Sequence, residues 1–498
     1  MEKREAAEGA ALLPGGGGVL LRLQTGDEEE DKRLRVAVTK ELKKLMSIAA
    51  PMVVVTVSQY LQLEVVSLMM VGHRSELSLS SVAMATALCT VSGFSVLLGM
   101  AGALETLCGQ AYGAKKYEKL GIYTYSSMVS LLLVSIPLSL LWIFLDKLLI
   151  LAAQDPLISH EAGKYATSLI PTLFAYAILQ SLVRYFQTQC LLFPMLLSSC
   201  ATLCFHVLLC WALVFKFDLG NVGAALANGV SCWLNVIGLG LYMKYSSACE
   251  KSRVPFSKDV FLSIGEFFRL AIPSAVMVCL EWWSFELLIL LSGLFPNPKL
   301  ETSVLSICLT VTSLHYFIPY GFGAAASTRV SNELGAGNPK AANVVVWAVM
   351  ILAVTEAIVV CTILFCSRHI LGYAYSNEKE VVDYVSDITP LICLSVVLDS
   401  SHAVLSGVVR GCGWQDIGAC VNLGAFYLVG LPLAALLGFI LNLRGKGLWI
   451  GTEIGSMVQL TLLALFTSLA NWQKQATKAS ERIFKGKLSA DIELSSIE

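Results

Sequence analysis

The chain alternates between long apolar segments and short polar connections. Twelve of the apolar segments hold about 20 or more residues, which is enough for a helix to cross a bilayer. They lie near residues 45–72, 79–106, 119–143, 160–188, 192–215, 221–244, 262–293, 301–329, 341–366, 383–409, 417–441 and 447–471. The pattern predicts an all-α membrane protein with twelve spanning helices.

The second six segments repeat the first six. At a spacing of 222 residues, the matches are Pro51 with Pro273, Glu64 with Glu286, Gly99 with Gly321, Thr106 with Thr328 and Gly113 with Gly335. A repeat of six helices is a parallel repeat, whose lobes are related by an axis along the membrane normal. We therefore predict two six-helix lobes with a site between or within them. The expected division is a disordered tail at 1–44, an N-lobe at 45–246, a linker at 247–261, a C-lobe at 262–472 and a polar tail at 473–498.

Composition agrees with this reading, because 56% of the residues are hydrophobic and only 14% are charged, whereas soluble domains are about 25% charged. The net charge of −1 gives no reason to expect a nucleic-acid partner. The 15 cysteines show no CxxC pair and no metal-ligand spacing, so we read them as small core residues and expect no metal. The Gly- and Glu-rich start does not resemble a signal peptide.

Lysine and arginine are distributed unevenly between the connections, which predicts the orientation in the membrane. One side carries residues 32–44, 115–119, 244–258, Arg329, Lys340 and the basic C-terminal tail. The other side carries less than half as many basic residues. Both termini are therefore expected on the cytosolic side.

Two carboxylates, Glu281 and Glu286, lie in the apolar run that begins near Leu270, and that run holds no Lys or Arg. A charge at the centre of a spanning helix costs roughly 2.5–3.5 kcal/mol, so such a residue is usually functional or paired. Pro273 precedes both acids, and a proline removes a backbone hydrogen bond and can bend a helix. We interpret Pro273 and its repeat mate Pro51 as hinges.

Several stretches resemble the multidrug and toxic compound extrusion (MATE) transporters of plants, also called the DETOXIFICATION family. They are ALETLCGQAYGA at 103–114, QDPLIS at 154–159, LEWWSFE at 280–286, PYGFGAAASTRVSNELGAGNP at 319–339 and VRGCGWQ at 409–415. The resemblance covers about residues 40–472. It implies the MATE fold of the MOP superfamily, with two lobes in a V, and a secondary antiporter that exports organic compounds in exchange for protons or sodium.

By the motifs of that family, the proton-carrying acids of the C-lobe fall on Glu281 and Asp399, with Glu286 as a second acid of the seventh helix. Some animal members place another acid in the eighth helix, where this chain has Thr310. The repeat mates of Glu281 and Asp399 are the amides Gln59 and Gln180, so proton coupling is expected in the C-lobe. Glu286 is equally well read as a structural acid, because its mate is Glu64.

Further polar and aromatic residues are candidates for a cavity that takes flat or cationic compounds. Besides Gln59 and Gln180, they are Trp282, Trp283, Tyr316, His402, Asn422 and Tyr427. His402 follows Asp399 by nearly one turn and could tune it, although a core histidine fits the sequence as well. Packing or a place at the membrane interface is the alternative for each aromatic residue.

The sequence thus predicts a proton-coupled exporter of organic small molecules that works by alternating access. The substrates would be plant secondary metabolites, hormones such as abscisic acid, or xenobiotics, and no cofactor other than H⁺ is expected. The alternatives are sodium coupling, a lipid-translocating relative of the same superfamily and a membrane-bound enzyme. Against an enzyme, no paired catalytic groups are seen, and against a lipid translocator, the spanning segments are poor in Arg and Lys. We expect a monomer in the plasma membrane, with the vacuolar membrane as the alternative.

Overall fold

The computed structural model describes residues 16–152, 154–374 and 378–495, with the side chains of all but 16–34, 298–299 and 485–495 of them. The described chain consists of helices and their connections. Residues 1–15 of the expected N-terminal tail lie outside the described residues.

The first half of the chain forms the N-lobe, in which long helices are interrupted by short π-helical segments. Its elements are α1 Gly16–Tyr60, η1 Leu61–Val66, α2 Ser67–Gly72, α3 Glu76–Cys89, η2 Thr90–Phe94, α4 Ser95–Ala101, α5 Ala103–Gly113, α6 Tyr117–Ile143, α7 Leu145–Leu151, α8 Pro156–Ser168, α9 Ile170–Thr188, α10 Leu192–Trp211, η3 Ala212–Lys216 and α11 Gly220–Tyr245. The connection to the second half contains η4 Ser247–Cys249 and α12 Asp259–Leu262.

The second half forms the C-lobe and ends in a polar helix. Its elements are α13 Ile264–Ser292, α14 Pro298–Gly335, α15 Pro339–Leu371, η5 Gly372–Ala374, α16 Lys379–Cys412, α17 Gln415–Asn422, η6 Leu423–Gly430, α18 Leu431–Ala435, η7 Leu436–Ile440, α19 Arg444–Ser468 and α20 Trp472–Ser495.

Within the described residues, 11 helical segments are long and apolar enough to cross a membrane. The count becomes 12 when α8 and α9, which meet at a bend of 46°, are taken as one span. This bent pair covers the segment 160–188, which the sequence predicted as a single helix. The predicted all-α membrane fold is confirmed.

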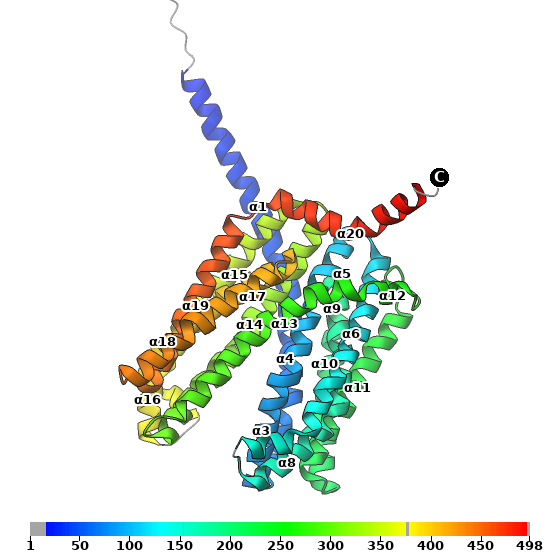
Figure 1. Cartoon of the computed structure of the whole chain (residues 1–498). Coiled ribbons are helices and arrows are strands. Elements are labelled where there is room, and N and C mark those ends of the chain that lie inside the picture. The colour runs from blue at the N-terminus through cyan, green and yellow to red at the C-terminus, as the bar shows by residue number, and fades with distance from the viewer. Residues whose placement is uncertain (1–15, 153, 375–377, 496–498) are drawn as a thin grey trace, which may run out of the picture.

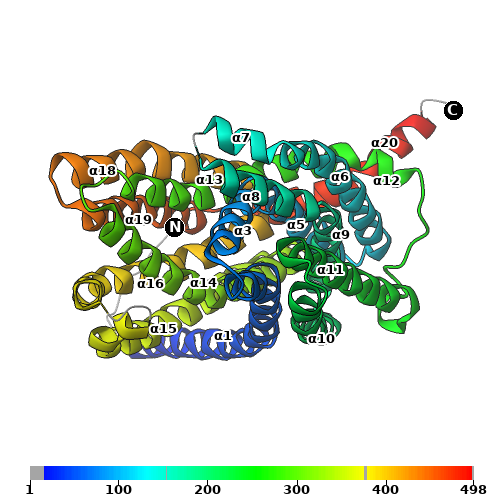
Figure 2. The same cartoon turned by 90° about the horizontal axis from the view of Figure 1, so that it is seen from below.

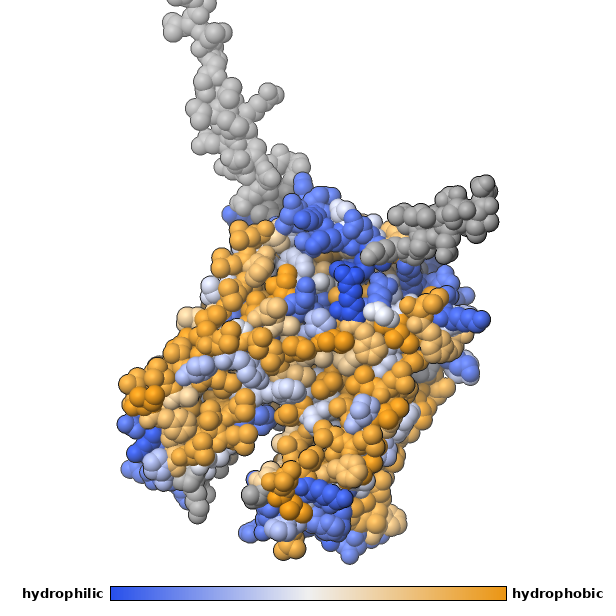
Figure 3. All heavy atoms as spheres, in the orientation of Figure 1, coloured by the Kyte–Doolittle hydropathy of each residue, from blue (hydrophilic) through white to orange (hydrophobic). Residues whose placement is uncertain are grey.

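The two lobes meet at one end of the molecule and separate at the other. Figure 1 shows both ends of the chain at the end where the lobes meet, and Figure 2 shows the two helix groups side by side. In the space-filling view, apolar residues cover the flanks between two polar ends, and a cleft opens between the lobes opposite the termini (Figure 3). The apolar flanks are the surface expected to face lipid.

The helices that join the lobes are related by the internal repeat. Helix α1 packs on α14, and α13, which corresponds to α1 in the repeat, packs on α4. A Cβ atom added to Gly99 would lie 2.7 Å from Cα of Ala275, and one added to Gly321 would lie 2.5 Å from a methyl group of Val53. These two glycines match in the repeat, and each lets two helices approach closely where the lobes touch.

Helical structure begins earlier in the chain than the sequence indicated and continues into the polar tail at the other end. Helix α1 already begins at Gly16, so residues 35–44 are helical rather than part of a disordered tail. The physical reason is that Glu41 is buried and binds Arg329 of α14, with both guanidinium contacts at 3.1 Å. The C-terminal tail forms α20, whose Trp472 ring packs beside Trp414.

The basic connections lie at the end that carries the termini, which leads to a test of the orientation. We expect cysteines introduced at the exposed positions Glu118 and Lys258 to stay unlabelled when intact cells are treated with an impermeant thiol reagent. A cysteine at the exposed Lys216, near the opposite end, should be labelled. Labelling is measured as the increase over the parent chain, and labelling of the first two positions from outside would reverse the predicted orientation.

Candidate functional site

Glu281, on α13, is the centre of a polar network inside the C-lobe. Its side chain is buried, and its oxygens accept hydrogen bonds from the phenol of Tyr316 at 3.3 Å, the amide of Asn422 at 3.3 Å and the amide of Gln459 at 3.4 Å. These donors come from α14, α17 and α19 respectively. All three donors are neutral, so this set contains no ion pair.

Asp399, on α16, is the second predicted acid of this network. Its Oδ1 lies 3.2 Å from Nε2 of His402, one turn along the same helix. Both side chains are buried. The Tyr316 and His402 ring centres are 6.2 Å apart, so Tyr316 lies between the two acids. The structure therefore brings together five of the predicted site residues: Glu281, Asp399, His402, Tyr316 and Asn422.

A third acid, Glu453 on α19, was missed by sequence reasoning. It is buried, and its Oε1 accepts a hydrogen bond of 2.6 Å from Ser395, which in turn accepts one from the indole of Trp449 at 3.0 Å. Glu453 lies within electrostatic reach of His402, as do Glu281 and Asp399. The sequence did contain a signal for it, because Glu453 is a carboxylate inside the apolar run 447–471. A charge within a spanning helix is costly, and this reason for singling out Glu281 applies equally to Glu453.

The corresponding place in the N-lobe holds amides rather than acids. The Nε2 of Gln180 donates to Oε1 of Gln59 at 3.4 Å, and these residues are the repeat mates of Asp399 and Glu281. The matched positions thus hold amides in the N-lobe and carboxyl groups in the C-lobe.

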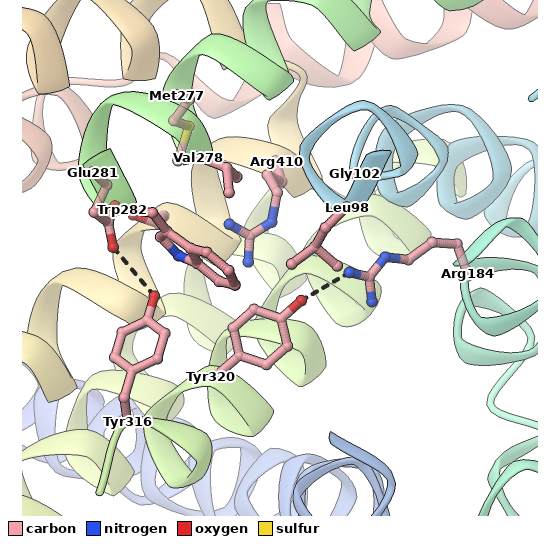
Figure 4. A pocket seen from close by; sticks show the side chains of 11 residues that line it. Leu98, Gly102, Arg184, Met277, Val278, Glu281, Trp282, Tyr316, Tyr320 and Arg410 are labelled. Atoms are coloured by element: carbon pink, nitrogen blue, oxygen red, sulfur yellow. Dashed lines mark hydrogen bonds between the residues drawn. The ribbon is translucent and has the colours of Figure 1, made fainter. Parts of the chain in front are cut away.

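A small cavity lies where the lobes meet, beside Glu281, and residues of both lobes line it (Figure 4). Its lining consists of Leu98, Gly102, Arg184, Met277, Val278, Glu281, Trp282, Tyr316, Tyr320, Ser406 and Arg410. Aromatic rings and the Glu281 carboxyl group thus share one space with two guanidinium groups. Trp282 and Tyr316 lie where the sequence placed them.

The two arginines of this cavity were not foreseen, although Arg184 lies within a predicted span and Arg410 directly follows one. Glu105, on α5, lies between them, 2.8 Å from Nε of Arg410 and 3.2 Å from Nε of Arg184. All three side chains are buried, and Arg184 also donates to the phenol of Tyr320 at 2.8 Å. The spans are therefore less poor in arginine than the sequence suggested, and the pair of Glu105 with Arg410 joins the two lobes.

Around this ion pair, the interface is sealed by close backbone contacts and by α20. A Cβ atom on Gly113 would lie 2.0 Å from the carbonyl oxygen of Asn332, and one on Gly335 would lie 2.1 Å from that of Gln110. The side chain of Gln110 also accepts a hydrogen bond of 2.8 Å from Arg482 of α20. Burial lowers the pKa of Arg482 below its usual value, and the charge of nearby Glu266 opposes that shift.

Other predicted residues lie outside the network. The indole of Trp283 donates to the carbonyl oxygen of Val91 in the N-lobe at 3.0 Å, and its side chain is exposed. The hydroxyl of Tyr427 has no hydrogen-bond partner among the described residues. Glu286 does not line the cavity beside Glu281. It lies within electrostatic reach of Glu64, its mate in the repeat. Cavity roles for Trp283 and Tyr427 are therefore not supported by their contacts.

The proline hinge stays a prediction, because α13 runs as one helix through Pro273 and α1 runs through Pro51. We expect Pro273→Ala to restore a backbone hydrogen bond, stiffen α13 and lower the transport rate several-fold, while the amount of folded protein is unchanged. The comparison is with Pro137→Ala in α6, an exposed position inside a helix of the N-lobe. Equal transport rates for the two variants would show that Pro273 serves packing alone.

Comparison with known proteins gives three kinds of match. The family model described as MatE matches the chain twice, at residues 51–212 and 273–436, and the two matches begin at the paired prolines. Protein DETOXIFICATION 14 of Arabidopsis thaliana is 58% identical over 461 residues, which cover 93% of this chain and 95% of that protein. Protein DETOXIFICATION 12 of the same plant is 56% identical over 445 residues, covering 89% of this chain and 92% of that protein.

The crystal structure of the eukaryotic MATE transporter AtDTX14 matches with a TM-score of 0.86 and 58% identity, and covers 90% of this chain and 100% of that one.

Proposed function

Since this chain belongs to the MATE family of membrane transporters, we propose that it is an antiporter that exports organic small molecules in exchange for protons. The family and the relatives are transporters, not enzymes.

The observation that carries the proposal is the contrast between two kinds of buried acid. Glu105 is held between two arginines, which keep a carboxylate charged at all physiological pH values. Glu281 has only neutral donors, and Asp399 has a histidine, which itself titrates near neutral pH. Acids in such surroundings can take up and release a proton, whereas Glu105 can serve only as a fixed charge.

The arrangement of the lobes supports alternating access. The cleft opens away from the termini, and the contacts of Glu105, Gly113 and Gly335 close the other end. With the termini in the cytosol, this conformation is open to the outside. Return to the inward-open state would separate α5 from α16 and break the ion pair of Glu105 with Arg410.

The cavity beside Glu281 indicates the substrate class. Trp282, Tyr316 and Tyr320 offer flat apolar surfaces next to a carboxyl group, which suits planar organic molecules that carry a basic nitrogen. Plant secondary metabolites and xenobiotics with such a nitrogen are the proposed range, and an acidic hormone such as abscisic acid would instead pair with the guanidinium groups of Arg184 and Arg410 in the same cavity. One proton moving down 100 mV and one pH unit could sustain a gradient of roughly 500-fold for a neutral compound.

The proposal is tested with the purified full-length chain in proteoliposomes loaded with ethidium, a fluorescent organic cation. An imposed pH step should drive ethidium across the membrane, and an imposed sodium step of the same size should not. Movement driven by sodium alone would replace the proton as coupling ion. If neither step moves ethidium but either one moves a labelled lipid, the chain would be a lipid-translocating member of the superfamily.

The cellular membrane is proposed from the same reasoning. Export from the cell requires the plasma membrane, which we favour over the vacuolar membrane. A fluorescent fusion of the protein that co-localises with a vacuolar marker would show that it resides in the vacuolar membrane instead.

A further inference from the structure

A second polar cluster lies in the C-lobe, apart from the network of Glu281. It consists of His315 on α14, Glu356 on α15 and Ser400 on α16, three helices that pack on one another (Figure 1). Nε2 of His315 lies 2.9 Å from Oε1 of Glu356, and the hydroxyl of Ser400 donates to Oε2 at 2.8 Å. Both carboxyl oxygens of Glu356 are therefore bonded, each by a different helix.

Glu356 lies in an environment where a charge is costly. Helix α15 contains the most apolar of the candidate spans, with a mean hydropathy of 2.6, and Glu356 lies near its middle. The side chain of Glu356 is 11% exposed and that of His315 is 4% exposed. A carboxylate in such a span is retained for a reason, which is usually function or a specific partner.

The partner of Glu356 is a histidine, so the charge of the cluster depends on pH. Histidine is the side chain whose unperturbed titration falls between about pH 5 and 8. When Nε2 of His315 donates to Glu356, the ring can accept a proton only at Nδ1, and Nδ1 is buried without a partner. The cluster carries a charge of −1 before this proton binds and is a neutral ion pair afterwards.

Other titratable groups around the cluster do not replace this histidine. The thiol of Cys361, on α15, is within electrostatic reach of Glu356 and contacts the backbone of Cys393 on α16. Helix α1 also packs on α15, but its polar side chains Tyr60 and Glu64 interact elsewhere, with Phe317 and Thr90. On α14 and α16, the next residues are Tyr316 and Asp399, which belong to the network of Glu281.

The position of the cluster connects it with that network. His315 precedes Tyr316, and Ser400 follows Asp399, so the two polar groups lie on different faces of the same two helices. A rotation or bend of α14 or α16 that accompanies a change of charge on one face must move the other. The hydrogen bond between Ser400 and Glu356 therefore connects the cluster directly to α16, the helix that carries Asp399.

In the described part of the N-lobe, the positions that match His315 and Ser400 carry no titratable group. The repeat mate of His315 is Gly93, where a Cβ atom would lie 2.5 Å from the ring of Trp142. The mate of Ser400 is Ser181, whose hydroxyl lies 3.0 Å from that of Ser127. In the N-lobe an indole ring and two hydroxyls thus occupy the place where the C-lobe holds an imidazole and a carboxyl group. This is the same asymmetry as that between the acids Glu281 and Asp399 and their amide mates.

We infer that His315 and Glu356 form a second proton-binding site of this transporter, with Ser400 linking it to the helix of Asp399. The inference rests on the proposed proton exchange and adds one proton to the cycle. The proton comes from water, binds at Nδ1 of His315 and is released to water from the same atom. No other group is transferred.

The direct test counts protons and needs no substrate. The purified chain in lipid nanodiscs is titrated between about pH 5 and 8 with a pH-indicator dye, and the protons bound per molecule are compared. Glu356→Gln should bind about one proton fewer than the parent, because a buried histidine without a counter-charge stays neutral. Thr355→Val, at the exposed position next to Glu356, removes no titratable group and should leave the count unchanged.

An equal count for Glu356→Gln and the parent would overturn the inference, because the pair would then keep a fixed charge. If Glu356→Gln does not fold, the double variant His315→Leu with Glu356→Leu gives the same comparison, since replacing both members of a buried ion pair by apolar residues is often tolerated. Its count should also fall by about one proton, and an unchanged count would likewise overturn the inference.

The transport readout separates this site from the first one. In proteoliposomes with the membrane potential clamped at zero, ethidium accumulation should change about 100-fold per pH unit if two protons move and about 10-fold if one moves. Glu356→Gln should still exchange ethidium for protons. Its ethidium accumulation should change about 10-fold per pH unit instead of about 100-fold. An unchanged slope would contradict the second proton. Absence of exchange in the parent would contradict the proposed function, while the proton count would still decide on the site.

Discussion

Glu281→Gln and Asp399→Asn should each abolish transport driven by a pH gradient while the protein remains folded. The amides keep the size and the hydrogen-bonding capacity of the acids but cannot bind and release a proton. Burying a neutral amide costs less than burying an unpaired charge, so the folded state should tolerate both changes. The loss is expected to be at least about 100-fold in the rate of pH-driven exchange, as for removal of a group that transfers a proton.

The measurement uses ethidium-loaded proteoliposomes with an imposed pH step, and the amount of folded transporter is checked by size-exclusion chromatography. Ethidium binding should persist in Asp399→Asn, because Asp399 does not line the cavity, and should weaken in Glu281→Gln, which removes the carboxyl group beside the rings of Trp282 and Tyr320. Adding an acid in the N-lobe, by Gln59→Glu or Gln180→Asp, should not restore exchange, since the proton would then sit in the wrong lobe. Full pH-driven exchange in both neutral variants would remove these acids from the coupling mechanism.

Glu105→Gln should shift the protein away from the conformation in which the end with the termini is closed. The substitution leaves Arg184 and Arg410 buried without their shared counter-charge, and breaking a buried pair in this way typically costs about 3–5 kcal/mol. Because Glu105 and Arg410 belong to different lobes, much of that cost falls on the closed state. Transport should fall at least tenfold, because the cycle must pass through that state.

The shift is measured as the distance between spin labels at Glu118 and Lys340, which are exposed on different lobes near the termini. Glu105→Gln should increase this distance, and labels at Leu157 and Leu294, both exposed and on different lobes, should approach each other across the cleft. Glu333→Gln is the matched control, because Glu333 binds Arg329 within the same helix, and Arg329 keeps Glu41.

The double variant Glu105→Gln with Arg410→Gln should recover part of the lost stability, because it removes one of the two uncompensated cations. If Glu105→Gln behaves like Glu333→Gln in distance and transport, the pair of Glu105 with Arg410 does not hold the lobes together.

The C-lobe network shows how much of a buried site local sequence patterns can predict. Glu281 was predicted because it is a carboxylate in an apolar run, a feature that is visible without any partner. Glu453, Glu356 and Arg184 have the same feature in their own runs. They were not singled out, because a single charge in a span does not show whether it faces a cavity, a partner or a lipid headgroup.

The sequence by itself determined the number of spans, the two-lobe repeat and the family. These features rest on periodicity and spacing, since about 20 apolar residues must form a helix in a bilayer wherever they are placed. The repeat also identified which positions correspond in the two lobes, and the matched glycines Gly99 and Gly321 do lie at matched helix crossings.

Only the tertiary structure decided which polar groups meet. Glu105 contacts Arg410 and His315 contacts Glu356 across large separations in the chain, and neither pairing follows from spacing along one helix. The pairing depends on the rotation of each helix about its axis, which is set by close packing against its neighbours at glycines and other small residues. That rotation placed the indole of Trp283 against the backbone of the N-lobe, and it separated Glu281 and Asp399 from Glu105, the acid that pairs across the two lobes.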